Sequence, residues 1–273
     1  MEFSVVMSVY RNDRPEFFVR AIESVTSCQT RKPDEVVIIV DGPVSESVDY
    51  AIKSFVERQP SLFRIIRFEE NQGLGNALRV GVEQARCPII ARMDSDDVSL
   101  PDRFEKQIGY LESHPDCDIV GGQISEFIEK EENIIAVRRV PCRHGELIKW
   151  LKGRCPFNHM SVAMLRSRVL VSGNYMDWHF NEDYYLWIRM AQQGCRFANL
   201  PDTLVNVRVG AEMYARRGGW KYFRSEERLQ RYMLRYHVIS PLRYLHNIIG
   251  RFVVQVAMPN KLRAWIFRRF FRD

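Results

Sequence analysis

Several features that would assign this chain to a common functional class are missing from it. Its six cysteines include no Cys-x-x-Cys pair, which disfavours a zinc site or a disulfide framework and fits reduced thiols. Neither G-x-G-x-x-G nor G-x-x-x-x-G-K-S/T occurs, so dinucleotide binding and P-loop hydrolysis are disfavoured. No apolar run reaches the ~20 residues of a membrane-spanning helix. The opening MEFSVVMSVYRND lacks a basic segment ahead of the apolar one, so we expect a strand there and no signal peptide.

Charge is distributed unevenly along the chain. Residues 208–273 contain fifteen Lys/Arg and four Asp/Glu, a net charge of +11. Because the whole chain carries +6, residues 1–207 carry −5. An acidic body with a basic end indicates two tasks rather than one uniformly basic protein. We therefore expect a main domain over residues 1–207 and a basic helical region over 208–273.

Short apolar runs alternate with helix-like segments over the first hundred residues. Strands are predicted at FSVVMSVY, EVVIIVD, LFRIIRF and PIIARMD, and helices at 15–25, 48–56 and 74–85. This alternation is typical of β-α-β units. The predicted fold class is α/β, with a Rossmann-like, mostly parallel sheet flanked by helices and a basic helical C-terminal appendage.

The pattern changes after residue 97. Helices are predicted at 101–113, at 146–151, from 182 onward and at 220–236, with β-like pieces at 117–128 and 134–140. No linker rich in Pro, Gly or Ser separates the two parts. We therefore expect residues 1–97 and 98–207 to be two halves of one continuous domain.

Four aspartates are predicted to gather at one edge of the sheet. Asp41 ends one apolar strand, and Asp94, Asp96 and Asp97 follow another. Ligands of open parallel sheets bind just beyond the carboxyl ends of the strands. Carboxylates this close repel one another unless a cation offsets their charge, and Mg²⁺ or Mn²⁺ bridging a diphosphate prefers such oxygen ligands. A solvated turn or a helix cap explains an isolated D-x-D well, but the match with Asp41 favours a metal site.

Glu182 and Asp183 form a second acidic pair, at a predicted helix start. The helix dipole favours carboxylates at this position, which is a sufficient structural explanation. The functional explanation is a general base, because in-line transfer to a hydroxyl needs a carboxylate to take its proton. The residues alone leave both explanations open.

Six motifs then occur in order along nearly the whole chain: SVVMSVYRND, IIVDG, ENQGLGNAL, ARMDSDD, PFNHMSV and NEDYYLW. Each is weak alone, but their order and spacing resemble the family 2 glycosyltransferases of the GT-A fold. Bacterial O-antigen and exopolysaccharide transferases are especially similar, including the stretch VRVGAEMYARRGGWKY. The resemblance implies a GT-A catalytic domain over 1–207, with a nucleotide-sugar donor half at 1–97 and an acceptor half at 98–207.

The resemblance implies donor-binding roles at the sheet edge. Tyr10 would stack on the uracil, and Asp41 would accept a hydrogen bond from the base. Asp94 would contact the nucleoside and contribute to the metal site, while Asp96 would coordinate the metal that holds the diphosphate. Asp97 belongs to a D-x-D-D variant of the motif and is implicated less firmly.

Three further residues match donor-side positions of the family. Asn71 and Gly73 fall in its N-x-G loop, which would line the donor cleft, although a turn at a helix start explains them equally well. Arg208 would meet the diphosphate. Many family members carry a histidine in the stretch after this arginine, where this chain has Val209-Gly210, and this departure weakens the transfer of late metal or phosphate contacts.

On the acceptor side, Asp183 would be the catalytic base and Glu182 would assist. Asn158 and His159 would touch the acceptor or a phosphate. A lone histidine is more often a hydrogen-bonded structural residue, so that alternative stays open.

The implied enzyme is an inverting, metal-dependent hexosyltransferase with Mn²⁺ or Mg²⁺ as cofactor. It would move a hexose from a UDP-sugar, preferably UDP-Glc or UDP-Gal, to a GlcNAc or GalNAc on a lipid pyrophosphate or to a growing polysaccharide repeat unit. An α-linked donor would give a β-linked product. The Q-x-x-R-W motif of processive synthases is absent, which predicts addition of a single sugar.

Two rival classes are weighed against this enzyme. A catalytically silent nucleotide-sugar-binding or scaffold protein of the same fold is the main alternative, and the intact Asp96 and Asp183 argue against it. A nucleotidyltransferase should have a glycine- and Lys/Arg-rich phosphate loop after its first strand, and VYRNDRPEF contains no glycine.

The C-terminal segment NKLRAWIFRRFFRD interleaves basic and apolar residues. As a helix it would present one broad apolar face, which fits an interfacial helix on anionic lipid. The protein would then be cytoplasmic and peripheral at the inner membrane. Alternatively, this face packs on the main domain or on a second subunit of a homodimer. Nucleic acid is not an expected partner, because no recognised binding motif accompanies the charge.

Overall fold

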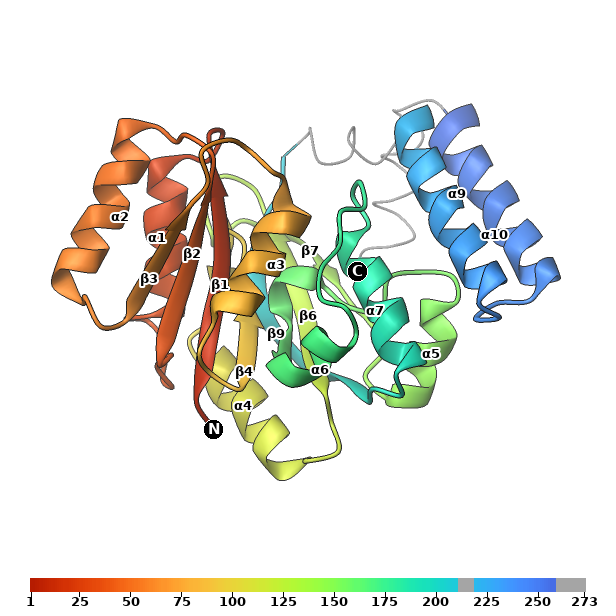
Figure 1. The fold of residues 1–273 in the computed structure, drawn as a ribbon, viewed down its shortest axis with the longest axis horizontal. Helices are drawn as coiled ribbons and strands as arrows, with labels where there is room; N and C mark the ends of the chain where they lie inside the picture. Colours follow the sequence, from red (N-terminus) through yellow and green to blue (C-terminus); the bar gives the residue numbers. More distant parts are fainter. Residues whose placement is uncertain (211–218, 259–273) are drawn as a thin grey trace.

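The computed structural model describes residues 1–210 and 219–258, and these form an α/β structure built on one nine-stranded sheet (Figure 1). The strand order is β3-β2-β1-β4-β8-β6-β9-β5, with β7 paired to β6. The strands are β1 (Phe3–Tyr10), β2 (Glu35–Asp41), β3 (Phe63–Arg67), β4 (Ile89–Arg92), β5 (Val98–Ser99), β6 (Ile119–Phe127), β7 (Ile134–Arg138), β8 (Ala163–Leu165) and β9 (Phe197–Arg208). The helices are α1 (Pro15–Val25), α2 (Glu46–Arg58), α3 (Leu74–Gln84), α4 (Arg103–Ser113), α5 (His144–Leu151), α6 (Arg166–Val171), α7 (Glu182–Gln192), α9 (Trp220–Arg235) and α10 (Pro241–Phe252), with short turns η1 (His159–Ser161) and η2 (Val253–Ala257).

The donor half is entirely parallel, as the β-α-β pattern predicts. β2 pairs with β3 and β1, and β1 pairs with β4, always in parallel. Alternate residues of these strands enter opposite cores, because successive side chains point to opposite faces. In β1, Val5 and Val9 join the core under α1 and α2, whereas Val6 joins the core under α3. Helices therefore cover both faces of this part of the sheet (Figure 1).

Close packing of α3 depends on a glycine. A Cβ added at Gly81 would lie 2.5 Å from Val6 Cγ1 and 3.5 Å from Ile39 Cγ1. The missing side chain thus brings the α3 backbone down onto the sheet, which holds the loop before α3 at the carboxyl edge of β2.

The acceptor half has mixed pairing. β8 is antiparallel to both β4 and β6, β5 is antiparallel to β9, and β6 runs parallel to β9. β9 was not predicted, because Pro201 and Asp202 interrupt its apolar pattern; the register of its pairing with β6 shifts around Gly121–Ile124. The domain boundary predicted at residue 207 falls one residue before the end of this strand.

The predicted basic helix is α9, and it forms a hairpin with α10 beside α7 (Figure 1). The hairpin is joined to the main body through polar contacts: Trp178 Nε1 donates to Ser225 O at 3.2 Å, and Asn247 Nδ2 donates to Lys152 O at 2.8 Å. In the described part of the chain, no helix has the length and apolarity needed to cross a bilayer. The predicted interfacial segment NKLRAWIFRRFFRD starts at Asn260 and lies outside the described residues.

Candidate active site

The carboxyl ends of β1, β2 and β4 place the predicted donor residues at one sheet edge. Tyr10 pairs directly with Asp41, and Val6 pairs with Arg92, so Asp94 lies just beyond the end of β4 at the same edge. The prediction that Asp41 and Asp94 share this edge is confirmed. Tyr10 is half-buried there, and its backbone N–H donates to Asp13 Oδ2 at 2.9 Å.

Asp41 organises the loop that precedes α3. Its buried carboxylate accepts hydrogen bonds from Asn71 Nδ2 at 2.8 Å, Gln72 N at 2.6 Å and Gly73 N at 3.0 Å. Gly73 has φ of 86°, a left-handed conformation that favours glycine, at the start of α3. A carboxylate offers about four acceptor positions. Most acceptor positions of the Asp41 carboxylate are thus occupied by the loop. The predicted contact with a base would have to use the acceptor position that is left.

The aspartates after β4 form a compact oxygen cluster. One carboxylate oxygen from each of Asp94, Asp96 and Asp97 lies within 4.8 Å of the others. The protein around Asp96 displaces water, and Asp94 and Asp13 add negative charge, which together raise the pKa of Asp96 to about 7. The Asp96 side chain is nevertheless exposed, so a cation could reach it. Burial, followed by the charges of Asp96 and Asp94, also raises the pKa of Asp97 well above its usual range. Three crowded carboxylates with an accessible member fit a hard divalent cation.

Asp13 is a member of this region that the sequence analysis missed. Its Oδ2 accepts from Ser95 Oγ at 2.9 Å as well as from Tyr10 N, so it ties the end of β1 to the acidic loop. Burial raises its pKa to about 6, despite these hydrogen bonds, with a further contribution from Asp94. The only sequence signal for it is an aspartate shortly after the first strand.

Arg208 contacts the acidic loop from β9. Its backbone N–H donates to Asp97 Oδ1 at 2.9 Å, and its Nε donates to Asp96 O at 3.2 Å. Its guanidinium lies 3.7 Å from the ring centroid of Phe17 and 4.6 Å from that of Phe127. The structure places Arg208 beside the oxygen cluster, where it fixes the loop. Its contact with a diphosphate stays a prediction.

Arg92 is a buried cation that interacts with both acidic groups, and the sequence analysis missed it. It is 2% exposed and forms an ion pair with Asp94 through Nη2. Its Nε and Nη1 have no hydrogen-bond partner among the described residues. Its positive charge also lowers the pKa values of both Glu182 and Asp183, against the larger effect of burial. An arginine inside the apolar run PIIAR, directly before an acidic motif, is the signal that could have identified it.

Glu182 and Asp183 occupy the first turn of α7, where the helix dipole favours negative charge. Asp183 Oδ1 accepts from Tyr184 N at 2.6 Å, and Cys155 Sγ lies 3.5 Å from Oδ2. Burial, and then the charge of Asp183, raises the pKa of Glu182 to about 7. Burial also raises the pKa of Asp183. Carboxyl groups with raised pKa values are suited to accept a proton near neutral pH.

The two predicted acceptor residues have different environments. His159 borders the cavity described below; its Nε2 lies 2.9 Å from Tyr175 Oη, and burial followed by the charge of Arg92 lowers its pKa well below 6.5. Asn158 is fully buried and donates from Nδ2 to Gly122 O at 2.9 Å. Asn158 therefore lies away from the cavity wall and supports β6, whereas His159 is a neutral group within reach of a ligand.

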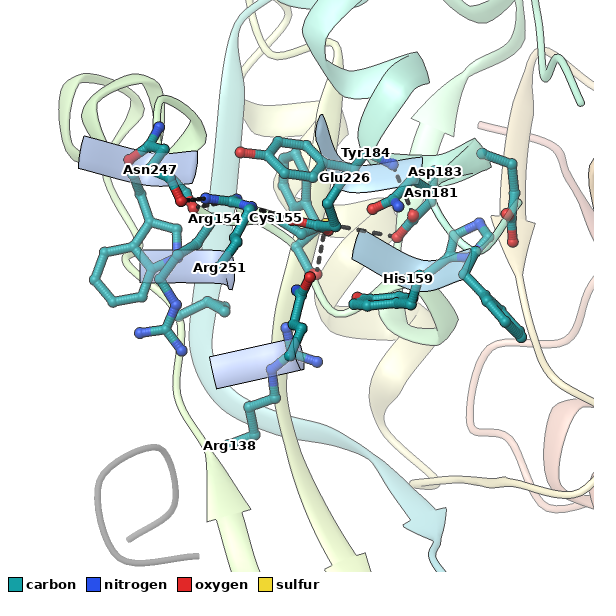
Figure 2. Close-up of a pocket in the computed structure, with 18 of the residues that line it drawn as sticks. Arg138, Arg154, Cys155, His159, Asn181, Asp183, Tyr184, Glu226, Asn247 and Arg251 are labelled. Atoms are coloured by element: carbon teal, nitrogen blue, oxygen red, sulfur yellow. Dashed lines mark hydrogen bonds and ion pairs between the residues drawn. The ribbon is translucent and has the colours of Figure 1, made fainter. Parts of the chain in front are cut away.

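One cavity of about 840 Å³ brings the donor and acceptor sides together. Arg92, Asp94, His159, Glu182 and Asp183 line one part of it. The remaining wall comes from the end of β7, the segment after α5 and the α9–α10 hairpin. Figure 2 shows Asp183 and His159 on one side, with Arg138, Arg154 and Arg251 on the other. Basic groups thus face a pair of carboxylates, an arrangement suited to an anionic substrate with a reacting hydroxyl.

Comparison with known proteins defines the class of this site. The model of glycosyl transferase family 2 matches residues 4–172, and a related model, glycosyl transferase family group 2, matches residues 89–268. The chain belongs to glycosyl transferase family 2. This confirms the resemblance drawn from the six motifs.

Particular relatives match along almost their whole length. A glycosyltransferase of Haemophilus influenzae is 40% identical over 272 residues, covering 100% of both chains. The amylovoran biosynthesis glycosyltransferase AmsE of Erwinia amylovora is 36% identical, covering 98% of each chain. The Escherichia coli UDP-Gal:alpha-D-GlcNAc-diphosphoundecaprenol beta-1,3-galactosyltransferase is 34% identical, covering 99% of this chain and 97% of its own.

Solved structures support the fold. TarS 1-349 of S. aureus in complex with UDP-GlcNAc has a TM-score of 0.66 at 14% identity, covering 93% of this chain and 73% of that one. Mannosyltransferase PcManGT from Pyrobaculum calidifontis, in complex with GDP-Man and Mn²⁺, has a TM-score of 0.63 at 14% identity, covering 96% and 71%. The predicted GT-A fold is confirmed.

Proposed function

We propose that this glycosyltransferase moves a hexose from a UDP-sugar to a lipid-pyrophosphate-linked GlcNAc or GalNAc, with inversion at the anomeric carbon. The observation that carries the proposal is that Asp94 and Asp183 border one cavity, together with the buried Arg92, which pairs with Asp94 and lowers the pKa of Asp183 against the larger effect of burial. A relative at 34% identity is named for transfer of galactose from UDP-Gal to GlcNAc-diphosphoundecaprenol, which supports UDP-Gal as the first donor to test.

On this proposal, Asp183 takes the proton of the acceptor hydroxyl. At the same time, the hydroxyl oxygen attacks the anomeric carbon from the side opposite the diphosphate. The bond from that carbon to the diphosphate oxygen breaks, UDP leaves with the electron pair, and an α-linked donor gives a β-linked product. Asp94 and Asp96 would hold a Mn²⁺ or Mg²⁺ ion, which supplies positive charge to the departing diphosphate. Tyr10, at the end of β1, would stack on the base.

The first test measures UDP release from a panel of UDP-sugars with a lipid-pyrophosphoryl GlcNAc analogue, with Mn²⁺ and with chelator. Wild type should release UDP only with acceptor and metal. Asp183→Asn should lower kcat by about 10²–10⁴, the usual contribution of a general base. Asp177→Asn is the matched control, because Asp177 is an exposed aspartate on the loop before α7 and should retain activity.

Two results would count against this proposal. Undiminished turnover by Asp183→Asn would show that Asp183 is not the catalytic base, although the protein would still be a transferase. Tight UDP binding without turnover of any donor or acceptor would favour the catalytically silent binder instead. We further propose, from the basic C-terminal end, that the enzyme works as a cytoplasmic protein peripheral to the inner membrane.

A further inference from the structure

The α9–α10 hairpin carries two stripes of like residues on its surface. In α9, every exposed position except Trp220 is basic, and these five positions form what we call the basic stripe: Lys221, Arg224, Arg228, Arg231 and Arg235. Along α10 and its continuation, exposed large apolar residues form what we call the apolar stripe: Leu242, Leu245, Ile249, Phe252 and Val253. Both sets recur every three or four residues, apart from the neighbours Phe252 and Val253, so each occupies one side of its helix.

The polarity of α10 is reversed relative to an ordinary surface helix. Its inward side is polar: Asn247 Nδ2 donates to Gln230 Oε1 at 2.7 Å, and Arg251 forms a buried ion pair with Glu226. Its outward side is apolar, with Leu242 78%, Leu245 54% and Ile249 55% exposed. An amphipathic helix normally turns its apolar side to the core. Phe252 also packs its ring against that of Phe223 in α9, with 5.7 Å between centroids, whereas Leu242, Leu245 and Ile249 are left largely exposed by the described fold.

Charge and aromatic residues around the apolar stripe identify its partner. The two acidic residues of α9 offset one member of the basic stripe, Arg231, which pairs with the half-buried Glu227. Glu226 is instead turned inward to Arg251. The ring of Trp220 lies 6.0 Å from that of Phe252, so an exposed tryptophan extends the apolar stripe. Apolar side chains, an interfacial tryptophan and a row of cations are together suited to an anionic lipid surface.

We propose that the outer surface of the α9–α10 hairpin docks on an anionic lipid bilayer. The apolar stripe enters the headgroup region, and the basic stripe contacts the lipid phosphates. This surface is formed by residues within 219–258, and the proposal assigns no role to residues 259–273. The proposal does not depend on the sugar-transfer reaction.

Docking in this way places the active-site cavity close to the membrane surface. Asn247 and Arg251 of α10, together with Val254 of η2, line that cavity. A helix is about 10 Å wide, so the cavity opens within roughly one helix diameter of the lipid headgroups. A sugar carried on a membrane lipid would then reach Asp183 without leaving the bilayer.

The test measures flotation of the full chain with vesicles of phosphatidylglycerol and phosphatidylethanolamine, and with vesicles of phosphatidylcholine alone. Three variants are compared with wild type: an apolar triple (Leu242→Gln, Leu245→Gln, Ile249→Gln), a basic triple (Lys221→Gln, Arg224→Gln, Arg235→Gln), and a control (Tyr50→Gln, Val171→Gln) at residues 76% and 67% exposed elsewhere. All these side chains are exposed, so melting temperatures should remain close to wild type. With a water-soluble acceptor, UDP release should also be unchanged, which separates this test from that of the reaction.

We expect wild type to bind the anionic vesicles. The basic triple should weaken that binding by about fivefold per charge removed and leave binding to phosphatidylcholine unchanged. The apolar triple should weaken binding at least tenfold on both vesicles, and the control should bind like wild type. Equal vesicle binding by all variants would overturn the proposal. So would loss of a dimer, without loss of lipid binding, in the apolar triple, because the stripe would then bind a second copy of the chain.

Tryptophan quenching by brominated phosphatidylglycerol separates the hairpin from the C-terminal segment. Hairpin docking predicts that Trp220→Phe removes part of the quenching that bound protein shows. If only Trp265→Phe removes quenching, the lipid contact belongs to residues 259–273, and hairpin docking is wrong.

Discussion

The buried carboxylate of Asp41 provides a sharp test of how the donor side is built. Replacing Asp41 by Asn removes the charge that three donors share: Asn71 Nδ2, Gln72 N and Gly73 N. The amide keeps one acceptor oxygen but turns its own N–H groups toward at least one of these donors. Hydrogen bonds to a charged group contribute about 1.5–3 kcal/mol each, and an unpaired buried donor costs about 1–3 kcal/mol. We therefore expect Asp41→Asn to lower the free energy of unfolding by about 2–4 kcal/mol.

The measurement is urea unfolding and a thermal melt, together with UDP binding by calorimetry. For a chain of this size, the loss should lower the melting temperature by on the order of 5–10 °C. Glu46→Gln removes an exposed charge nearby, at the start of α2, and should change stability by less than about 0.5 kcal/mol. UDP affinity should fall together with loop stability, and Asn71→Ala should reproduce part of both effects. Unchanged stability of Asp41→Asn with a tenfold weaker UDP affinity would refute this reasoning and assign the carboxylate to base recognition.

Three further predictions concern metal, pH and the buried cation. Mn²⁺ should raise the melting temperature of wild type at pH 7.5, and Asp96→Asn should remove most of that increase in differential scanning fluorimetry, because an exposed ligand can be lost without unfolding the protein. With chelator present, the free energy of unfolding should fall as pH rises from about 5 to 8. The reason is that the pKa of Glu182 is raised to about 7 in the folded protein, so this carboxyl group stabilises the fold only while it stays protonated. Glu182→Gln should reduce this pH-dependent loss in the free energy of unfolding by about 1–2 kcal/mol, as measured by urea titrations. An unchanged dependence of stability on pH would show that Glu182 is not its cause. Arg92→Met should destabilise the protein by about 1–3 kcal/mol, since the partly exposed Asp94 would lose its charged hydrogen-bond partner; a variant as stable as wild type would show that the ion pair contributes little.

Much of the donor half could be predicted from the sequence because its strands follow local rules. The apolar runs ending at Tyr10, Asp41 and Arg92 are the parallel strands β1, β2 and β4, and α1 has the predicted bounds. Parallel strands necessarily bring their carboxyl ends to one edge, so their terminal residues had to lie together. The oxygen cluster after β4 follows from the same rule.

Contacts between segments that are distant in the sequence were harder to predict. β9 spans Pro201 and Asp202, which read as a turn, yet its pairing with β6 and β5 holds it extended. Asn158 was predicted to touch the acceptor, but the fold buries it beneath β6, where its amide supports a backbone carbonyl. Neither outcome follows from neighbouring residues, because strand pairing and burial depend on segments distant in the chain.

By itself, the sequence determined the family, the parallel donor half and the two acidic groups, because short apolar runs and ordered motifs are local properties. Only the tertiary structure decided that Arg92 interacts with both of those groups, that the carboxylate of Asp41 accepts three hydrogen bonds from a loop, and that α10 turns its apolar side outward. The physical reason is that a charge or an apolar stripe acquires its role from what packs opposite it. That partner is determined by how segments distant in the sequence pack together, and no single stretch of sequence contains this information.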